Sequence, residues 1–301
     1  MLFTTSRNWK PRWRYRAHGY LWRMHFSGAG RIIIEERNPD AKKASFSCLE
    51  ESTGKPVWQD LSFDEPWWIG IEDVTRRYIF FHRYRKPDMP RHMGITACAV
   101  ETGRILWERP DCVFDFANED EIVISRDDFE RPSFLVLDAA TGEVTATLEP
   151  ESPKRKAGIN RRDRFAGFVY PDTYASPEQL QAGHRDLLQR VVPLETLVGN
   201  VDVLSYRNNL FVAWHEVTKS GVQTSRVEKT KMRSTAGDGD EDGSWSICQR
   251  MAGIDADGRV VLDLVLLEET SAPAPDSFFV KDGQLLVLQG RTTLLSFDTE
   301  R

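Results

Sequence analysis

The residues in this sequence that could bind a metal ion or transfer a proton are spread along the chain. Six histidines occur, none of them in an HxH or HExxH pair: His18, His25, His82, His92, His184 and His215. His82 and His92 bracket RYRKPDMPR, a proline-containing segment that can form a loop and bring the two imidazoles close together. A two-histidine metal or haem site is one interpretation of this pair. Ordinary strand or surface histidines are the favoured interpretation.

The cysteines and the acidic motif do not predict a metal site. No CxxC pair occurs among Cys48, Cys98, Cys112 and Cys248, so we expect reduced thiols that pack as small buried residues. GDGDEDG places Asp238, Asp240 and Asp242 like the start of a calcium loop, but the twelfth position is Gln249, which has no carboxylate. GxSxG, Walker and strand-linked GxGxxG motifs are also missing. We therefore expect no catalytic residue, cofactor or metal, with a non-enzyme favoured over an enzyme.

Basic and aromatic residues interleave near the N-terminus, where no acid precedes Glu35. The interleaved residues are Trp9, Arg12, Trp13, Arg14, Tyr15, Arg16, Tyr20, Trp22 and Arg23. A second basic stretch surrounds Asp163, although the net charge is −6: Lys154, Arg155, Lys156, Arg161, Arg162 and Arg164. Concentrated cations on an acidic protein suit an anionic partner or a membrane surface.

Ten of these residues, with the pair that follows Pro66, are our candidates for interaction with a partner. They are Trp9, Arg12, Trp13, Arg14, Tyr15, Arg16, Trp67, Trp68, Lys154, Arg155, Arg161 and Arg162. Tryptophan and arginine favour protein interfaces and bilayer headgroups, and stacking rings with arginine can also hold single-stranded nucleic acid. The alternative is that the aromatic rings pack on the fold while the arginines face water. For Trp67 and Trp68 we expect one ring to fill the core and the other to be exposed.

A repeated pattern of strand, Thr-Gly and strand is the strongest signal for the fold. It occurs in SFSCLEESTGKPVWQD, GITACAVETGRILWER and SFLVLDAATGEVTATL, and MAGIDADGRVVLDLVL has Asp-Gly at the same place. The turn residues Gly54, Gly103, Gly142 and Gly258 suit tight hairpins, which need positive φ. The first three recur about 40–50 residues apart, which is the length of one propeller blade.

The two ends of the chain are complementary. TTLLSFDTER stops where a second hairpin strand is due, and GYLWRMHF from Gly19 resembles that strand. The sequence therefore predicts an all-β protein, a β-propeller of about five to six four-stranded blades, closed by pairing of its N- and C-terminal strands. We expect an arm over residues 1–18 and a single propeller domain over 19–301. Insertions are expected near 150–200, with a helix at about 176–190, and at 219–245, a polar loop.

Trp58 and Trp107 follow the Thr-Gly turns, and this pattern resembles quinoprotein-type blades of pyrroloquinoline quinone dehydrogenases and outer-membrane assembly propellers. LWRMHF, EERNPDAKKASFSCLE, PWWIGIEDV and MGITACAVETGRILWE are more similar to an uncharacterised bacterial family of propeller-like proteins without assigned activity. This second resemblance covers most of residues 19–300. It implies the fold and no catalytic residues.

No run of eighteen apolar residues occurs, and the basic N-terminus is not followed by the apolar region of a signal peptide. We therefore expect a cytoplasmic protein, peripheral to the inner face of a membrane. The favoured function is a non-catalytic scaffold or accessory subunit with protein partners, on a membrane energy-converting complex such as a photosynthetic reaction centre. The first alternative is an enzyme or small-ligand binder that uses the central funnel of the propeller. The second is nucleic-acid binding through the arm, and an anionic membrane surface is a further partner.

Overall fold

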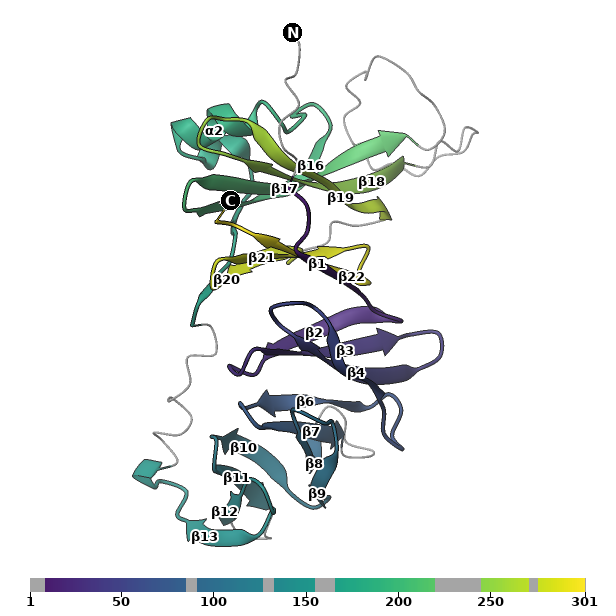
Figure 1. The fold of residues 1–301 in the computed structure, drawn as a ribbon, viewed down its shortest axis with the longest axis vertical. Coiled ribbons are helices and arrows are strands. Elements are labelled where there is room, and N and C mark those ends of the chain that lie inside the picture. The colour runs from purple at the N-terminus through teal and green to yellow at the C-terminus, as the bar shows by residue number, and fades with distance from the viewer. Residues whose placement is uncertain are drawn as a thin grey trace, which may run out of the picture. The chain divides into compact units, whose positions relative to one another are not determined.

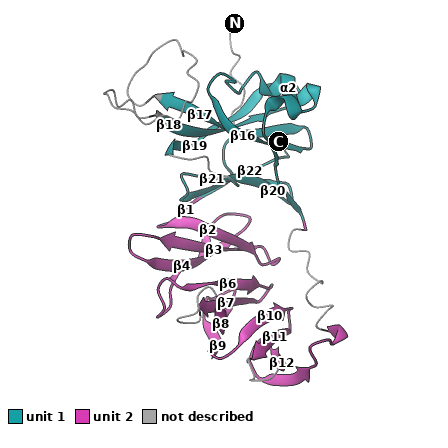
Figure 2. Ribbon diagram, turned by 180° about the vertical axis from the view of Figure 1, so that it is seen from behind, with its two compact units in different colours: residues 1–14, 167–301 teal, residues 15–166 magenta. Residues whose placement is uncertain are grey.

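The computed structural model describes residues 9–84, 91–126, 133–154, 166–219, 245–270 and 276–300. These residues form five antiparallel sheets and very little helix (Figure 1). They group into two compact units, one of residues 1–14 and 167–301 and the other of residues 15–166 (Figure 2). We call these unit 1 and unit 2. The boundaries of this grouping fall after Arg14 and after Ala166.

Unit 2 contains three four-stranded sheets whose strands follow one another in chain order. The first sheet comprises β2 (Tyr20–Phe26), β3 (Arg31–Asn38), β4 (Lys43–Glu50) and β5 (Pro56–Leu61). The second comprises β6 (Ile69–Val74), β7 (Tyr78–Tyr84), β8 (His92–Ala99) and β9 (Ile105–Arg109). The third comprises β10 (Val113–Ala117), β11 (Glu121–Arg126), β12 (Ser133–Asp138) and β13 (Val144–Leu148). Each sheet is therefore an antiparallel meander of the kind that forms a propeller blade.

Two five-stranded sheets make up the remainder. One has the order β1 (Trp13–Arg16), β22 (Thr293–Asp298), β21 (Gln284–Gln289), β20 (Phe278–Lys281) and β14 (Phe168–Val169). The other has the order β15 (Asp172–Tyr174), β16 (Leu197–Tyr206), β17 (Asn209–Lys219), β18 (Trp245–Ile254) and β19 (Val260–Thr270). The expected all-β class with blade-type sheets is confirmed, and an N-terminal strand does pair with the C-terminal one.

The strand that pairs with the C-terminal strand is not the one expected. GYLWRMHF contains β2, which begins a sheet of its own, whereas Trp13–Arg16 from the expected arm lies beside β22. The backbone N–H of Arg12 donates to the carbonyl of Ser296 at 2.7 Å. The side chains of β1 explain why this segment forms a strand. Buried aromatic and exposed basic residues alternate along it, which is the period of a strand with one face on the core.

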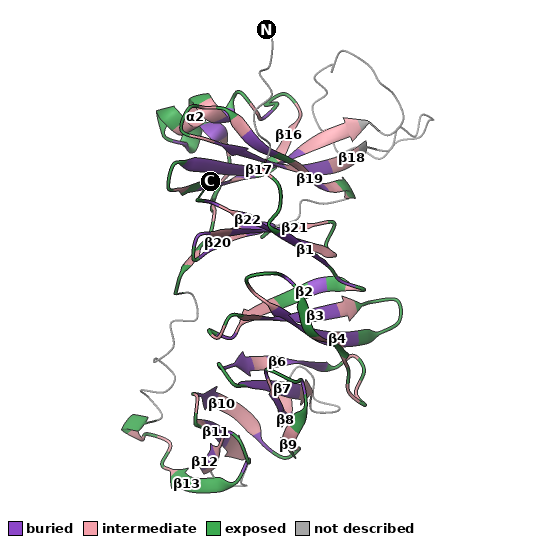
Figure 3. Ribbon diagram, in the orientation of Figure 1, coloured by how far each residue is buried: buried purple, intermediate pink, exposed green. Residues whose placement is uncertain are grey.

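The middle strands of the sheets supply the core. Ile32, Ile33 and Ile34 in β3 are fully buried, and β7 and β17 are buried over most of their length. Outer strands such as β13 are exposed along nearly their whole length (Figure 3). This is the distribution expected when β-branched and aromatic runs are enclosed between neighbouring sheets. The four cysteines are free and buried, as expected.

The turn glycines do more than reverse the chain. Gly103 and Gly142 have φ of +66° and +70°, and the backbone N–H of each donates to the residue four positions earlier. Each also lies under a tryptophan of the preceding sheet. A Cβ atom would lie 3.0 Å from Cδ2 of Trp58 at Gly103, and 2.6 Å from Cδ2 of Trp107 at Gly142. The indole nitrogens donate to the carbonyls of Val100 and Ala139, so successive sheets are joined by this contact.

The expected helix at about 176–190 is interrupted. A 3₁₀ turn η1 (Pro177–Gln179) and an α-helix α2 (Ala182–Leu188) replace it. Leu180 is extended, with φ −74° and ψ 152°, so the first turn stops there. The Arg185 guanidinium donates to the carbonyls of Glu178 and Leu180, which satisfies acceptors left free by the break. Residues 220–244, most of the expected polar loop, lie outside the described residues.

Candidate functional site

The first strands of the three sheets in unit 2 share a β-bulge. The pairing register shifts between Leu21 and Arg23, between Ile71 and Asp73, and between Phe114 and Phe116. The extra residues are therefore Trp22, Glu72 and Asp115. A bulge places two residues opposite one and re-aims the side chain of the extra residue. These three positions are where side chains depart from the alternation of an ordinary strand.

The bulge in β6 places Glu72 beside two histidines of the neighbouring strands. Its Oε1 lies 2.6 Å from Nδ1 of His92 in β8 and 3.4 Å from Nδ1 of His82 in β7. The two imidazole rings stack, with centroids 3.6 Å apart and planes 8° apart. One donor atom from each of the three side chains lies within 4.8 Å of the others. The structure thus assembles a carboxylate and two imidazoles, which we call the His-Glu cluster.

His82 is the buried member of the cluster. The residue is 2% exposed, and neither ring nitrogen has a hydrogen-bond partner among the described residues. The contact with Glu72 is within ion-pair distance but lacks hydrogen-bond geometry. Burial, with smaller contributions from His92, Arg23 and Arg37, lowers the pKa of His82 from 6.5 to about 3. The ring is therefore neutral near pH 7 and keeps a free lone pair.

A missing side chain makes room for this ring. Gly70 pairs with His82 across β6 and β7. A Cβ atom at Gly70 would lie 2.9 Å from Cε1 and 3.1 Å from Nε2 of His82. Any larger residue at this position would displace the imidazole, so the glycine is required by space rather than by its backbone angles.

Aromatic rings and an ion pair enclose the cluster. Tyr84 meets both imidazoles edge-on, with centroids 5.2 Å from His82 and 5.1 Å from His92. Glu35 accepts a hydrogen bond from Nε of Arg37 at 2.8 Å and forms an ion pair with the same guanidinium, whose Nη2 lies 2.6 Å away. Arg37 also donates to the backbone carbonyls of Trp67 and Ile69. The guanidinium is thus held in place and its charge is offset by Glu35.

The cluster can bind a cation or exchange protons, because it joins a carboxylate to two nitrogen bases. The side chain of His92 is 37% exposed and that of Glu72 is 16% exposed, so small ions can reach them from solvent. Sequence analysis identified the two histidines as a pair but gave no reason to include Glu72. A bulge is not visible in a single strand of sequence, and this explains why the carboxylate was missed.

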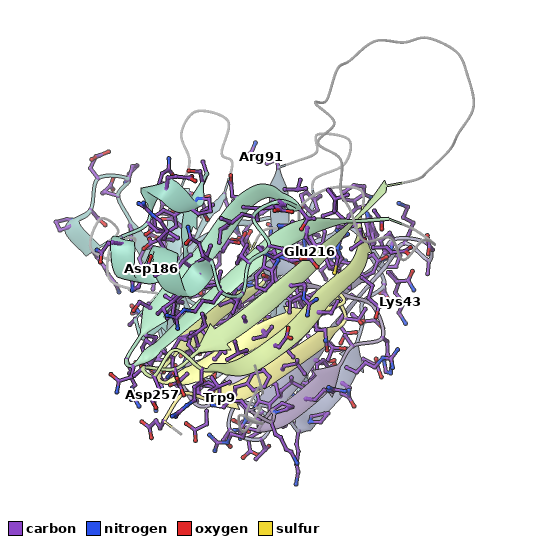
Figure 4. All side chains as sticks on the ribbon, turned by 90° about the horizontal axis from the view of Figure 1, so that it is seen from above. Trp9, Lys43, Arg91, Asp186, Glu216 and Asp257 are labelled. Carbon is purple, nitrogen blue, oxygen red and sulfur yellow. The ribbon has the colours of Figure 1, made fainter. Side chains whose placement is uncertain are left out.

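The aromatic members of the expected arm pack inward. Trp13 and Tyr15 are 7% and 4% exposed. Trp9, labelled in Figure 4, is half-buried. Its ring packs against Phe211, with ring centroids 5.9 Å apart, and its backbone N–H donates to the carbonyl of Val261. Arg12, Arg14 and Arg16 are exposed. Over residues 9–16 the structure therefore follows the alternative in which rings pack and arginines face water.

The next part of the interleaved segment is different, because its rings are exposed. Trp22 is 62% exposed and Tyr20 is 44% exposed. Both lie on β2, an edge strand of its sheet, and Trp22 is the bulge residue. Arg16 and Arg23, on either side in sequence, are exposed as well. We call Arg16, Tyr20, Trp22 and Arg23 the aromatic-basic edge.

The other interaction candidates fall in separate places. Trp67 is half-buried, with Arg37 and Lys42 over its ring at 5.2 and 5.1 Å, and Trp68 is 40% exposed beside Tyr84. Lys154 is exposed and pairs with Glu121 at 2.7 Å. The remaining candidates, Arg155, Arg161 and Arg162, lie outside the described residues. So do the acidic residues of the calcium-like motif.

Comparison with known families gave one match. Residues 27–107 match a family described as a domain of unknown function, DUF4905. The matched segment runs from β3 to β9 and includes the whole His-Glu cluster as well as Trp58 and Trp107. It covers less than half of the chain. Comparison with curated proteins gave no match.

Similar solved structures include several propellers. The β-propeller domain of the Trilobed protease from Pyrococcus furiosus is 10% identical, with 95% of this chain and 71% of that chain covered and a TM-score of 0.30. TolB from Acinetobacter baumannii is 11% identical, with 92% and 66% covered and a TM-score of 0.27, so this chain spans less than two thirds of it. An uncharacterized protein of Listeria monocytogenes is 10% identical, with 93% of each chain covered and a TM-score of 0.29. Because these TM-scores are low, the fold of this chain is assigned from its own strand pairing.

Among the described residues, no helix combines the length and the apolar character needed to cross a membrane.

Proposed function

We propose that this protein is a non-catalytic interaction module, an accessory subunit that binds a protein partner through the aromatic-basic edge. The observation that carries the proposal is the exposure of Trp22, 62%, at a bulge on an edge strand beside exposed Tyr20. Exposed aromatic rings that lie next to one another, rather than singly, mark a surface that a partner covers.

The composition of the edge also fits a protein interface. Tryptophan, tyrosine and arginine dominate the residues whose removal weakens protein complexes most. Arg16 and Arg23 add two cations to the two rings, so the edge suits a partner surface with exposed carboxylates. The bulge in the pairing of β2 with β3 supports this use, because a bulge bends and twists an edge strand and so hinders the addition of a strand from another chain. A partner would then contact the side chains of the edge rather than its backbone.

We further infer a position at the cytoplasmic face of a membrane, on an energy-converting complex such as a photosynthetic reaction centre. Exposed cations precede the edge at Lys10, Arg12 and Arg14. Such cations are attracted to anionic headgroups, where tryptophan and tyrosine rings also favour the interface. The membrane position is secondary to the protein partner in this proposal.

We also infer that the sheets of unit 2 are repeats of the quinoprotein type. The support is the contact of Trp58 with Gly103 and of Trp107 with Gly142, in which the tryptophan after one turn covers the turn of the next sheet. This kinship concerns the blade only. It brings no quinone chemistry to the chain, since fold and function are separable.

Affinity purification from the native organism tests the protein partner. We expect Trp22→Ala to weaken binding of the captured partner by about thirtyfold or more, the effect typical of a dominant interface residue. Ile105→Ala is the matched control, because Ile105 is 45% exposed on β9 of another sheet. Equal recovery of the same partners by both variants and the unmodified protein would contradict the proposal.

Two binding assays separate the alternatives. If the membrane position is right, liposomes with anionic lipid should retain the protein at low salt, and Arg12→Gln with Arg14→Gln should reduce the retention. If a single-stranded oligonucleotide binds with steep salt dependence and Trp22→Ala abolishes it, the edge is a nucleic-acid site and the protein-partner proposal fails.

A further inference from the structure

The His-Glu cluster offers the ligands of a transition-metal ion. Two imidazoles and one carboxylate, Glu72, His82 and His92, form the donor set, and one donor atom from each lies within 4.8 Å of the others. A set of two histidines and one acid is used for zinc in enzymes that keep a position open on the metal. Calcium and magnesium instead require six or more oxygen ligands.

The three ligands come from adjacent strands of one sheet. Glu72 lies in β6, His82 in β7 and His92 in β8, and these strands pair in that order. Two features of the backbone direct the side chains to one point: the bulge at Glu72 and the space left by Gly70. Ligands on paired strands are held more firmly than ligands on loops.

The buried imidazole of His82 indicates that a ligand binds at this place. His82 is 2% exposed, and within the part of the chain that the structure describes both of its nitrogens lack a hydrogen-bond partner. Burying a polar group without a partner is costly, and such groups are rare in folded proteins. The Tyr84 ring packs against that of His82 in a T-shaped pair, with planes 83° apart. Coordination of a metal ion by one nitrogen would satisfy the side chain.

We propose that Glu72, His82 and His92 bind one divalent transition-metal ion of the zinc type. The three side chains are the protein ligands, and the fourth position is left to water or to a small ligand. Zinc is preferred over softer ions because, among the described residues, no thiolate belongs to the donor set. Cys48 and Cys98 are buried in an apolar core cluster.

The present distances are close to those of a coordinated ion. A tetrahedral zinc ion with ligands at about 2.0–2.2 Å holds its ligand atoms roughly 3.3–3.5 Å apart. Nδ1 of His82 and Oε1 of Glu72 are already 3.4 Å apart. Nδ1 of His92 is 2.6 Å from the same oxygen, so these two atoms need to separate by less than about 1 Å. The stacked rings, with planes 8° apart, direct their nitrogen lone pairs in parallel, so the His92 ring must also turn out of the stack to aim Nδ1 at the ion. His92 is the more exposed of the two histidines, which gives its ring room for this rotation.

Neighbouring charges permit a cation at this place. Arg37 approaches the cluster, but Glu35 offsets its charge at 2.6 Å. Arg23 is exposed, and solvent screens its charge. The carboxylate of Glu72 supplies the remaining negative charge.

Zinc titration of the full-length protein, stripped beforehand with a chelator, tests the proposal. We expect one zinc ion per chain and a rise in the thermal unfolding temperature, because an ion that binds only the folded state stabilises it. Cobalt substituted for zinc should give the visible absorption of a four-coordinate site. Millimolar magnesium or calcium should not displace the ion.

Variants distinguish this site from adventitious binding. Glu72→Gln and His92→Gln should each weaken zinc binding by more than about tenfold and abolish the thermal shift. His18→Gln is the matched control, because His18 is 74% exposed and likewise faces a carboxylate, Asp60 at 3.3 Å. His92 is preferred to the buried His82 for substitution, and circular dichroism confirms that each variant folds. Absence of stoichiometric zinc, or binding that persists in Glu72→Gln and His92→Gln, would overturn the proposal. Partner capture by the aromatic-basic edge does not depend on either result.

Discussion

At the scale of single residues, a buried carboxylate fixes the start of unit 2. Glu36 is 2% exposed and accepts three hydrogen bonds: from the hydroxyl of Tyr15 at 2.6 Å, and from the backbone N–H groups of His18 and Gly19 at 2.8 and 3.2 Å. These bonds compensate the burial of its charge. The short connection between β1 and β2 is therefore held by one side chain of β3.

This arrangement predicts a loss of stability at alkaline pH. Burial, and then the hydrogen bond to Glu36, raises the pKa of Tyr15 from 10.0 to about 12. Between those values the folded protein retains a proton that the unfolded chain has lost, so the free energy of unfolding falls as pH rises; below pH 10 this contribution is fully present. Across the interval the loss amounts to about 2–3 kcal/mol.

Urea unfolding of the unmodified protein and of Tyr15→Phe, followed from pH 8.5 to 11.5, measures this contribution. The difference in unfolding free energy between the two should shrink with rising pH, since Tyr15→Phe has no phenol to ionise. Ionisation of the buried thiols, which also titrate at high pH, is common to both proteins and cancels. Parallel curves would show that Tyr15 does not keep its proton in the folded state.

At the scale of elements, the contact between a tryptophan and the next turn links neighbouring sheets. Trp107→Phe keeps an aromatic ring but removes the hydrogen bond to Ala139, so it should cost about 1 kcal/mol. Trp107→Ala should cost about 3 kcal/mol, the lower end for a large aromatic ring, since Trp107 is only partly buried. Trp22→Phe, at an exposed ring, should change stability by less than about 0.5 kcal/mol.

Chemical denaturation with a fluorescence or circular-dichroism signal measures these three values. Gly142→Ala provides an independent check, because a Cβ atom there would meet the Trp107 ring at 2.6 Å on a backbone with φ +70°. If Trp107→Phe and Gly142→Ala are both as stable as Trp22→Phe, the contact does not join the sheets.

The sequence predicts those features of the fold that depend only on residues close together in the chain. Gly54, Gly103 and Gly142 could be assigned to turns because positive φ is a property of the turn itself. The carbonyls that accept hydrogen bonds from the indoles of Trp58 and Trp107 could not be predicted, because Val100 and Ala139 belong to the next sheet. Strand β1 was missed for another reason: the alternation in WRYR was interpreted as an interaction surface, although alternation is also the mark of a half-buried strand.

The His-Glu cluster likewise has one part that the sequence predicts and one part that depends on strand pairing. His82 and His92 stood out because a proline-containing segment separates them, so a close approach was foreseeable. Their stacking, and the participation of Glu72, depend on a bulge and on the space above Gly70. Both are properties of strand pairing rather than of composition. The sequence therefore indicated the pair of ligands but not the third.

At the scale of the whole molecule, strand β1 changes how the N-terminal segment should be tested. Trp9 packs against the core of unit 1, Trp13 is buried, and the backbone N–H of Arg12 donates to the carbonyl of Ser296 in β22. Deletion of residues 1–17 would therefore uncover core residues and leave the outer edge of β22 without its partner. Exposed, unpaired strand edges promote association between chains.

We expect the protein that begins at His18 to unfold at a lower temperature than the full chain and to form aggregates on size-exclusion chromatography. Arg14→Gln with Arg16→Gln should behave like the unmodified protein, because both side chains are exposed on β1 and the strand stays in place. Thermal unfolding and elution profiles of the three proteins, compared at one concentration, decide the matter. A truncated protein that is monodisperse and equally stable would show that β1 is dispensable. Loss of a partner after truncation is evidence that the partner contacts β1 only if the truncated protein is monodisperse and stable. A damaged sheet would lose its partners whether or not they contact β1.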